Sequence, residues 1–397
     1  MTQNVAKLVF WGVRGSTPTL ERETWRYGGN TPCVEVTAPG GVRFILDCGT
    51  GLRMLGNKWI LLNGDTPTEA HILITHYHWD HIQGIPFFHP FYQSQGHFHF
   101  YGFQSKPLGP DSLRQVFEAQ LASPYFPAGT STMTALRSFR EITGGEKWEI
   151  QGTRVSAAWV NHPQGCLGYR LDMPVGSIVY ATDNEPGVPE LDRSLRQFAH
   201  GADVLIYDAQ YSPEQLSSTR KGWGHSSWLE GVKVARDSKV KNLILFHHDP
   251  DSSDSTVDGF LSAARQEFPG TWAATEGMSV TLSERGVNVA LRNSRMGQRR
   301  RLRFTATVSG QSDSGDQFEE KATVRDLSLQ GAYLFLNSRP RLQSELRVVI
   351  EATGDQNRSS VLSLRGTVVH CQSGREKNQN GVGVLFIEES DPDPPRD

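Results

Sequence analysis

The stretch "LITHYHWDHIQG" (Leu73–Gly84) decides the fold of the N-terminal part of the chain. It opens in an apolar run and then places three of the chain's 13 histidines, with an aspartate, inside six positions. Alternate residues of a strand face opposite sides, so a strand alone cannot point these side chains at one place. If the chain turns after Thr75, they surround one volume, and imidazole and carboxylate suit zinc, manganese or iron. The pattern therefore predicts ligands for two ions, from His76, His78, Asp80 and His81.

The length and composition of the chain limit the number of domains and the class of protein. At 397 residues it is too long for one ordinary core, and about two domains are expected. The net charge of -3 argues against a generally basic nucleic-acid binder. No apolar run approaches the roughly 18 residues of a membrane span, and the first residues lack the pattern of a secretory signal. The four cysteines lie far apart without a CxxC, so we expect reduced thiols and a cytoplasmic protein.

Strand and helix patterns alternate over residues 1–291, which predicts an α/β domain. Runs such as "VRFILD", "AHILIT" and "NLILFHHD" are typical of strands, and "GLRMLGNKWILL" and "TVDGFLSAARQEF" have helical apolar spacing. α/β folds place their sites where strands end. The polar residues that follow apolar strands in this way are Asp47, His76, Asp183, Asp208 and His247.

Residues 86–150 differ from their surroundings, because they are dense in aromatic residues, proline and glycine. Two interpretations stay open. The segment is either an insertion that forms a lid over the mouth of the site, or a peripheral core with its aromatic side chains inside.

The composition and pattern of the sequence change again near residue 290. Residues 292–298 belong to a basic connector, and residues 299–390 carry strand and turn patterns that predict a small antiparallel β-barrel. The acidic, proline-rich tail 391–397 is expected to be disordered.

The order of motifs along residues 1–291 resembles the metallo-β-lactamase fold superfamily, whose fold is an αββα sandwich. The motifs are "LDCGTG", "THYHWDH", "NHPQGCLGYR", "YATD" and "LFHHD". The resemblance implies that one ion is held by His76, His78 and His162, a second by Asp80, His81 and His247, and that Asp183 bridges them. It also implies that Asp47 orients a ligand histidine by hydrogen bonding.

The adjacent His247 and His248 leave an ambiguity in this ligand set. We favour His247 as the ligand because its place after "LILF" matches the strand-end ligand of the superfamily. His248 is then expected to support a ligand or to contact the substrate.

The segment "GWGHSSWLEG" adds a candidate proton donor, His225. It resembles the His-Ser/Thr motif of ribonuclease Z and related phosphodiesterases of the superfamily. That resemblance implies that His225 protonates the leaving group and that Asp208 orients it, so we count both with Asp80 as catalytic residues. The implied activity is cleavage of a cyclic nucleotide or a related phosphodiester.

The second domain carries a different signature. Arg299 and Arg303 form RxxxR, and "RDLSLQG" supplies Asp326, Ser328 and Gly331 at a turn between two strands. These residues resemble a PilZ domain, the bacterial receptor for cyclic di-GMP, and the resemblance implies that all five contact this ligand. Guanidinium forks suit both phosphates and the edge of guanine.

The combined hypothesis is a bacterial phosphodiesterase with two divalent ions, zinc before manganese or iron, whose activity cyclic di-GMP controls. One alternative is a ribonuclease that uses the arginines as a phosphate track. Another is a thioester or lactam hydrolase, which would not need His225. A third is a non-catalytic protein that responds to cyclic di-GMP. The natural substrate, the sign of the regulation and a homodimer stay open.

Overall fold

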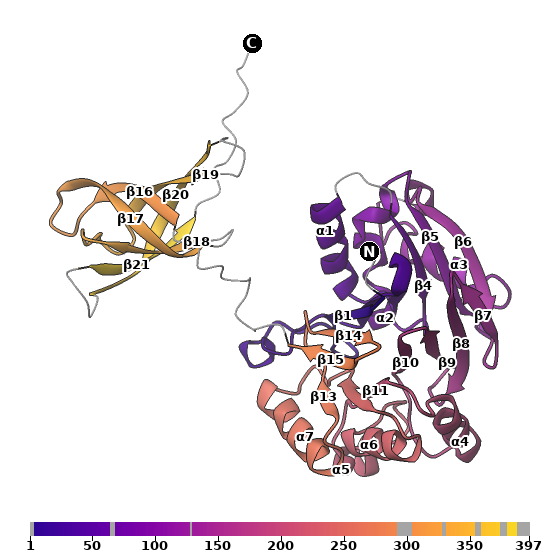
Figure 1. Ribbon diagram of the computed structural model, residues 1–397. Helices are drawn as coiled ribbons and strands as arrows, with labels where there is room; N and C mark the ends of the chain where they lie inside the picture. Colours follow the sequence, from indigo (N-terminus) through magenta and orange to yellow (C-terminus); the bar gives the residue numbers. More distant parts are fainter. Residues whose placement is uncertain are drawn as a thin grey trace. The chain divides into compact units, whose positions relative to one another are not determined.

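The structure is a computed structural model of the chain, which describes residues 4–63, 68–127, 129–291, 304–327, 331–353, 359–373 and 379–386. The chain divides into two compact units, Met1–Arg292 and Asn293–Asp397 (Figure 1). The predicted connector 292–298 and the acidic tail 391–397 lie outside the described residues.

The first sheet of the N-terminal unit has eight strands in the order β15-β14-β1-β2-β3-β4-β5-β6. Neighbours from β3 to β6 run parallel, whereas the strands from β15 to β3 pair antiparallel. The strand bounds are β1 (Ala6–Gly12), β2 (Cys33–Thr37), β3 (Arg43–Leu46), β4 (Glu69–Leu73), β5 (His97–Phe103), β6 (Leu136–Ile142), β14 (Ser279–Ser283) and β15 (Gly286–Ala290).

The second sheet has seven strands in the order β13-β12-β11-β10-β9-β8-β7. Its strands β10 to β13 are parallel, so their carboxyl ends meet at one edge of the sheet. The bounds are β7 (Lys147–Ile150), β8 (Thr153–Val160), β9 (Cys166–Met173), β10 (Gly176–Ala181), β11 (Val204–Asp208), β12 (Asn242–Phe246) and β13 (Thr271–Ala273).

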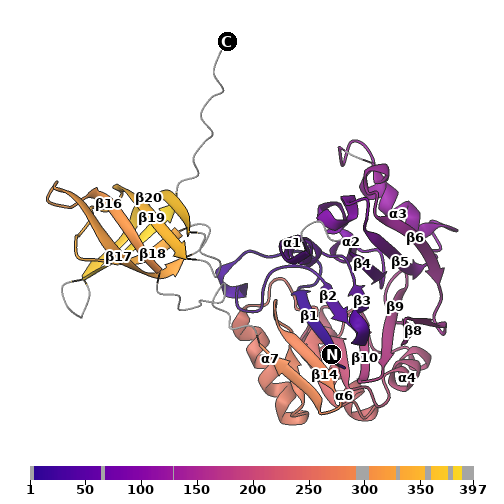
Figure 2. The ribbon, with the colours of Figure 1, turned by 45° about the horizontal axis from the view of Figure 1, so that its top comes forward.

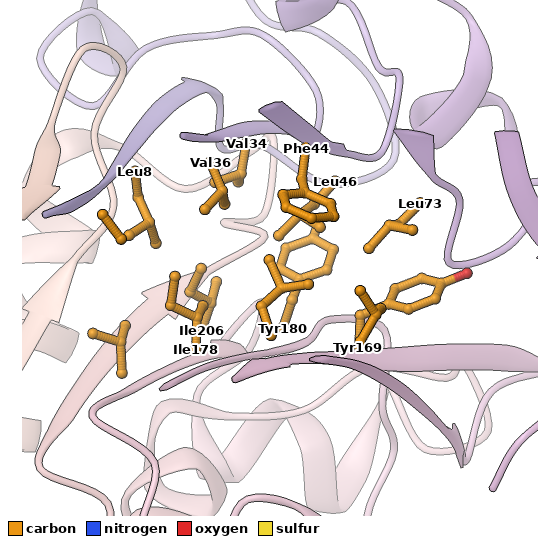
Figure 3. Close-up of a cluster of buried hydrophobic side chains, with 14 of the residues drawn as sticks. Leu8, Val34, Val36, Phe44, Leu46, Leu73, Tyr169, Ile178, Tyr180 and Ile206 are labelled. Carbon is orange, nitrogen blue, oxygen red and sulfur yellow. The ribbon is translucent and has the colours of Figure 1, made fainter. Parts of the chain in front are cut away.

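The two sheets pack face to face over the main hydrophobic core. Figure 3 shows Val36 and Phe44 of the first sheet opposite Ile178, Tyr180 and Ile206 of the second. These side chains are almost fully removed from solvent. Burial of a large apolar side chain stabilises a fold by about 1.5–3 kcal/mol. This shared core fixes one sheet against the other, and with it the strand ends that carry the site.

Helices cover the outer face of each sheet. On the first sheet lie α1 (Gly51–Asn63) and α3 (Ser112–Gln120), and on the second α4 (Pro189–Phe198), α6 (Trp228–Asp237) and α7 (Asp254–Glu267) (Figures 1 and 2). The remaining helices are short: α2 (Trp79–Ile82), α5 (Pro213–Ser218), and 3-10 turns at Arg22–Thr24, Pro39–Gly41, Ile85–Phe87, His89–Tyr92 and Thr130–Thr132. The predicted αββα sandwich is confirmed. None of the described helices is long and apolar enough to cross a membrane.

Many aromatic residues of segment 86–150 lie in the core, whereas Phe87 and Tyr125 are exposed. Phe88, Phe91, Phe98 and Phe100 are fully buried beneath the helices of the first sheet, and their rings pack edge to face or tilted. The segment also supplies β5, α3, β6 and β7. The burial of these rings agrees with a core, and the covering of the site's mouth by this segment stays a prediction.

The C-terminal unit contains a closed antiparallel barrel in the order β16-β17-β18-β21-β20-β19 (Figure 2). Its interior is filled by side chains such as Val308, Leu334, Val348 and Val382. Closure leaves no sheet edge free for pairing with other chains. The predicted small barrel is confirmed, with β16 (Phe304–Gln311), β17 (Gln317–Leu327), β18 (Gly331–Leu336), β19 (Glu345–Thr353), β20 (Ser359–Ser373) and β21 (Asn380–Phe386).

Candidate metal centre

Strand ends from both sheets bring the predicted ligands together. Asp47 follows β3, Asp183 lies two residues beyond β10, and His247 follows β12. All three have a left-handed backbone, with φ of 60°, 52° and 59°. Such conformations cost roughly 1–3 kcal/mol each and persist only where the surroundings hold them. Three strand ends that meet at one place thus each carry a residue in this unfavourable backbone conformation.

The first half-site consists of His76, His78 and His162, whose candidate ligand atoms all lie within 4.8 Å of one another. His162 Nε2 is 3.1 Å from His78 Nδ1. The other ring nitrogens face acceptors: His162 Nδ1 donates to the carbonyl of Gly224 at 2.7 Å, and His78 Nε2 to Gln164 Oε1 at 3.3 Å. The two nitrogens that face each other therefore both carry lone pairs.

The second half-site consists of Asp80, His81 and His247. His81 Nδ1 donates to Asp47 Oδ2 at 2.8 Å, and His247 Nδ1 to Gln210 Oε1 at 3.2 Å. These bonds leave His81 Nε2 and His247 Nε2 as lone pairs, 3.3 Å apart, with Asp80 Oδ2 3.3 Å from the first and 3.2 Å from the second. All three side chains are buried.

Asp183 lies between the half-sites. Its Oδ1 is 3.7 Å from His76 Nε2, and its Oδ2 is 3.3 Å from His81 Nε2 and 3.4 Å from His247 Nε2. Burial favours the neutral acid, but His247, His81 and His76 together hold the pKa of Asp183 well below its ordinary value. An ionised carboxylate thus faces both groups of imidazoles.

The donor set fits divalent cations. Opposed imidazole lone pairs in a buried site repel each other unless a cation or a proton lies between them. His76 Nε2 is also buried without a hydrogen-bond partner. Imidazole nitrogens with carboxylate oxygens are the ligands that zinc, manganese and iron share.

Asp47 is fixed by residues that the sequence reasoning missed. Its carboxylate accepts hydrogen bonds from the backbone N–H of Thr75 at 2.8 Å and from the hydroxyl of Tyr180 at 2.9 Å, besides the bond from His81. The hydroxyl of Thr75 donates to it as well, so four donors orient the carboxylate and with it the ring of His81. Tyr180 lies in β10, far along the chain, and no local pattern indicates this contact. The sequence indicates the contact of Gln210 only weakly, through its position two residues after the predicted site residue Asp208.

The candidate proton donor lies beside these ligands. His225 Nδ1 donates to Asp208 Oδ2 at 2.9 Å, and the ring of His225 stacks on that of His247 with centroids 5.0 Å apart. Asp208 in turn accepts from the backbone N–H of Asp183 and of Ser226, each at 3.1 Å. Burial disfavours the imidazolium, but the charge and hydrogen bond of Asp208 outweigh it and raise the pKa of His225 to about 9.

His248 does not share the environment of His247. Its Nε2 donates to the carbonyl of Ala274 at 2.9 Å, and its ring meets Tyr27 edge on. Burial and the nearby charge of Arg14 lower its pKa to about 3. His248 is only 2% exposed, and its expected role in supporting a ligand or contacting the substrate stays a prediction.

The loop "WGVRGSTP" contacts the candidate metal centre through Gly15 and Ser16, and Arg14 anchors the loop. The backbone N–H of Ser16 donates to Asp80 Oδ2 at 2.8 Å. A side chain at Gly15 would place its Cβ 2.4 Å from the ring of His247, so only glycine permits this approach. The buried guanidinium of Arg14 binds the carbonyls of Gly28 and Asp249, each at 2.9 Å, and thereby ties the loop to the segment after β12.

The predicted cyclic di-GMP residues fall partly outside the description. Arg299, Arg303 and Ser328 lie outside the described residues. Asp326 lies in β17 opposite Tyr333, and Gly331 begins β18 opposite Leu385. The ligand site of the barrel therefore stays a prediction.

Two family models match the chain. Residues 42–248 match the beta-lactamase superfamily domain, and residues 273–396 match the PilZ domain. The second match begins at β13, earlier than the boundary predicted from the sequence.

Relatives and solved structures agree with the first of these families. Ribonuclease Z of Methanothermobacter thermautotrophicus is 27% identical over an alignment of 326 residues that covers 69% of this chain and 96% of the relative. The metallo-beta-lactamase fold protein YhfI from Bacillus subtilis is similar in structure, with a TM-score of 0.52 and 18% identity over 70% of this chain and 100% of that protein. A diphosphatase from the PhnP family gives a TM-score of 0.50 and 19% identity over 70% and 98% of the two chains.

Proposed function

We propose that this metal-dependent hydrolase is a dinuclear phosphodiesterase controlled by cyclic di-GMP. The chain belongs to the metallo-β-lactamase superfamily and ends in a PilZ domain, and these two families are the starting point of the proposal. One observation carries the catalytic half of the proposal. In both half-sites the ring nitrogens that face inward carry lone pairs, because their partner nitrogens already donate to Asp47, Gln210, Gly224 and Gln164. Such an arrangement is built to hold cations.

The residues divide the chemistry between them. The first half-site would hold one ion, the second another, and Asp183 would contact both. Bound divalent ions lower the pKa of water and neutralise charge on a phosphoryl group. His225 keeps a proton on the ring because Asp208 stabilises the imidazolium, and it can give the proton of Nε2 to the departing alkoxide.

The His225–Asp208 pair favours a phosphodiester over a thioester. An alkoxide is a poor leaving group and gains from a proton donor, whereas a thiolate leaves readily without one. The buried Asp208 is held by the backbone N–H groups of Asp183, Gln210 and Ser226 besides His225. Thioester cleavage would not need the proton donor that Asp208 orients.

A second candidate is cleavage of RNA. It is favoured by the similarity to ribonuclease Z, which spans almost the whole length of that relative. RNA is itself a phosphodiester, so the same residues would serve, and the two candidates differ in what the site accepts.

The test is hydrolysis by the purified full chain loaded with zinc or manganese. The panel comprises cyclic nucleotides, a dinucleotide, an unstructured RNA and a thioester, each with a matched His78→Ala protein. We expect phosphodiester cleavage that the variant loses. Cleavage of the thioester alone, or turnover that survives in the variant, would refute the proposal. Cleavage confined to RNA would select the second candidate.

The regulatory half of the proposal rests on the signature at the barrel. Arg299 and Arg303 follow the boundary between the two units in the sequence. Binding of a ligand at this signature would shift the chain toward the state that binds the ligand better, and that state can differ in activity. We expect cyclic di-GMP to bind the full chain and to change its turnover, and both effects to disappear in Arg303→Ala but not in Arg341→Ala, an exposed arginine of the barrel. Turnover that is the same with and without bound cyclic di-GMP would refute the regulation.

A further inference from the structure

A cationic and aromatic rim lies next to the candidate proton donor. The guanidinium of Arg220 lies over the ring of Trp223 at 4.6 Å and over that of Tyr211 at 5.7 Å. Tyr211 in turn stands edge on to His225, with ring centroids 5.9 Å apart. A chain of ring contacts therefore leads from His225 through Tyr211 and Arg220 to Trp223. We call Arg220 and Trp223 the rim pair.

The segment that carries the rim pair is anchored to the metal centre. The carboxylate of Glu185 accepts hydrogen bonds from the backbone N–H of Gly222 and of Gly224, each at 2.7 Å. The carbonyl of Gly224 accepts from the ligand candidate His162. A Cβ at Gly224, where φ is +88°, would lie 2.2 Å from the ring of His162. The backbone on both sides of Trp223 is thus held in one place.

The rim pair is available to a ligand. Trp223 is 56% exposed, a large fraction for an indole beside a buried site. Among the described residues, no carboxylate lies within ion-pair distance of the Arg220 guanidinium, although weaker attraction from Asp249 reaches it. Lys221 beside it is exposed and adds to the positive charge. A guanidinium stacked on an indole keeps N–H donors at its edge for an anion.

We propose that Arg220 and Trp223 form a subsite for the leaving part of the substrate, and that this part is a nucleotide. The inference rests on the proposed function, since His225 is then the group that protonates the leaving oxygen. Whatever departs lies beside His225, and the contacts from His225 through Tyr211 lead to the rim pair. Trp223 stacks on the base, and Arg220 pairs with a further phosphate.

The subsite narrows the substrate class. Stacking of a base on an aromatic side chain tolerates any sequence, because every base has a π-face. A phosphate-binding arginine on the same side requires a second phosphate beyond the one that is cleaved. The substrate is therefore an oligonucleotide or a dinucleotide with a base and a phosphate on its leaving side, and a cyclic mononucleotide does not fill the subsite.

The first test is binding and needs no turnover. Calorimetry of the metal-loaded full chain compares adenosine 5′-monophosphate with ribose 5-phosphate, which lacks only the base. Trp223→Ala is expected to weaken binding of the adenosine compound by about 5- to 100-fold and to leave ribose 5-phosphate unchanged. Trp223→Phe is expected to restore most of the difference, which also shows that the loop still folds.

The chain offers a matched control for the rim pair. Arg22 and Trp25 have the same sequence spacing, with the guanidinium 6.0 Å from the ring, and Trp25 is 62% exposed. No described contact joins them to a ligand candidate. Trp25→Ala is therefore expected to change neither binding constant. An equal effect of Trp25→Ala and Trp223→Ala would overturn the subsite.

The second test separates the subsite from the proposed function. The full chain is given a dinucleotide and its counterpart without a base on the leaving side, and Trp223→Ala is expected to slow only the first. If the wild type cleaves the dinucleotide and Trp223→Ala alters neither binding nor rate, the subsite is wrong while the proposed function stands. If nothing is cleaved but the binding difference depends on Trp223, the subsite stands and the proposed reaction fails.

Discussion

The two half-sites of the metal centre differ in what holds their imidazoles. In the second half-site, His81 donates to the carboxylate of Asp47, and both His81 and His247 are fully buried. In the first, His162 donates to a backbone carbonyl and His78, which is only partly buried, to an amide oxygen. A carboxylate partner makes an imidazole a stronger ligand and fixes its ring more firmly than a neutral acceptor does. We therefore expect the second half-site to bind its ion more tightly.

The largest effect is expected where the two half-sites meet. Asp183→Asn removes the carboxylate charge that faces His76, His81 and His247, so binding of both ions should weaken and phosphodiester cleavage should fall below detection. Metal analysis and initial rates measure this. Asp237→Asn, which breaks an exposed ion pair with Arg196, should leave both unchanged. Full activity of Asp183→Asn would mean that the half-sites work independently.

The next change tests the difference between the half-sites directly. Asp47→Asn should weaken metal affinity about 10- to 100-fold, because the charged partner of His81 is lost. Gln164→Ala removes only a neutral acceptor from the exposed nitrogen of His78 and should weaken affinity less. Competition with a chelator measures both constants, and thermal unfolding checks that each variant folds. Equal losses of metal affinity in the two variants would contradict the expected difference between the half-sites.

A third change separates the proton donor from the ligands. His225→Ala should slow cleavage of an alkyl phosphodiester about 10²- to 10⁴-fold, the usual contribution of a general acid. A p-nitrophenyl ester needs no proton on its leaving group and should be cleaved at nearly the wild-type rate. Metal content should stay the same. Equal slowing of both esters would show that His225 acts on the ions and not on the leaving group.

The smallest effect concerns a buried histidine outside the site. His71 stacks on His99, and its nearest carboxylate, Glu69, is 3.9 Å away. Burial and His99 lower its pKa to about 4. The folded pKa is below the unfolded one, so its contribution to stability is complete above about pH 6.5 and is lost as the pH falls toward 4.

That loss should reach at most about 3 kcal/mol and should be reduced in His71→Asn. Denaturant unfolding between pH 7 and pH 4.5 compares this variant with the wild type and with His200→Asn, which changes an exposed histidine. An unchanged pH dependence in His71→Asn would show that burial without a close carboxylate does not govern the pKa of this histidine, in contrast to that of His81.

Much of the fold and of the candidate site follows from local sequence patterns. Apolar runs that end in a polar residue predicted β3, β4, β10, β11 and β12, and the order of the motifs predicted the sandwich. HxHxDH predicted ligands for two ions, and the resemblance to the superfamily assigned the ligands to two half-sites. The structure places these side chains together.

What the sequence could not predict depends on contacts between distant segments. Tyr180 reaches Asp47 across the two sheets, and Glu185 reaches Gly222 and Gly224 across a loop. Burial of the aromatic residues in segment 86–150 was one of two open interpretations, because composition alone does not tell which side of a sheet a ring faces. The separate surroundings of His247 and His248 follow from the left-handed backbone at His247, which no pattern of side chains reveals.

The most direct test of the central claim is the rate of dinucleotide cleavage by the metal-free full chain as zinc is added in measured equivalents. If the second half-site fills first and both ions are needed, the rate should stay low up to one bound equivalent and rise between one and two. In His78→Ala it should stay low throughout. A rate that is already maximal at one equivalent, or no cleavage with two ions bound, would contradict the account of a dinuclear phosphodiesterase.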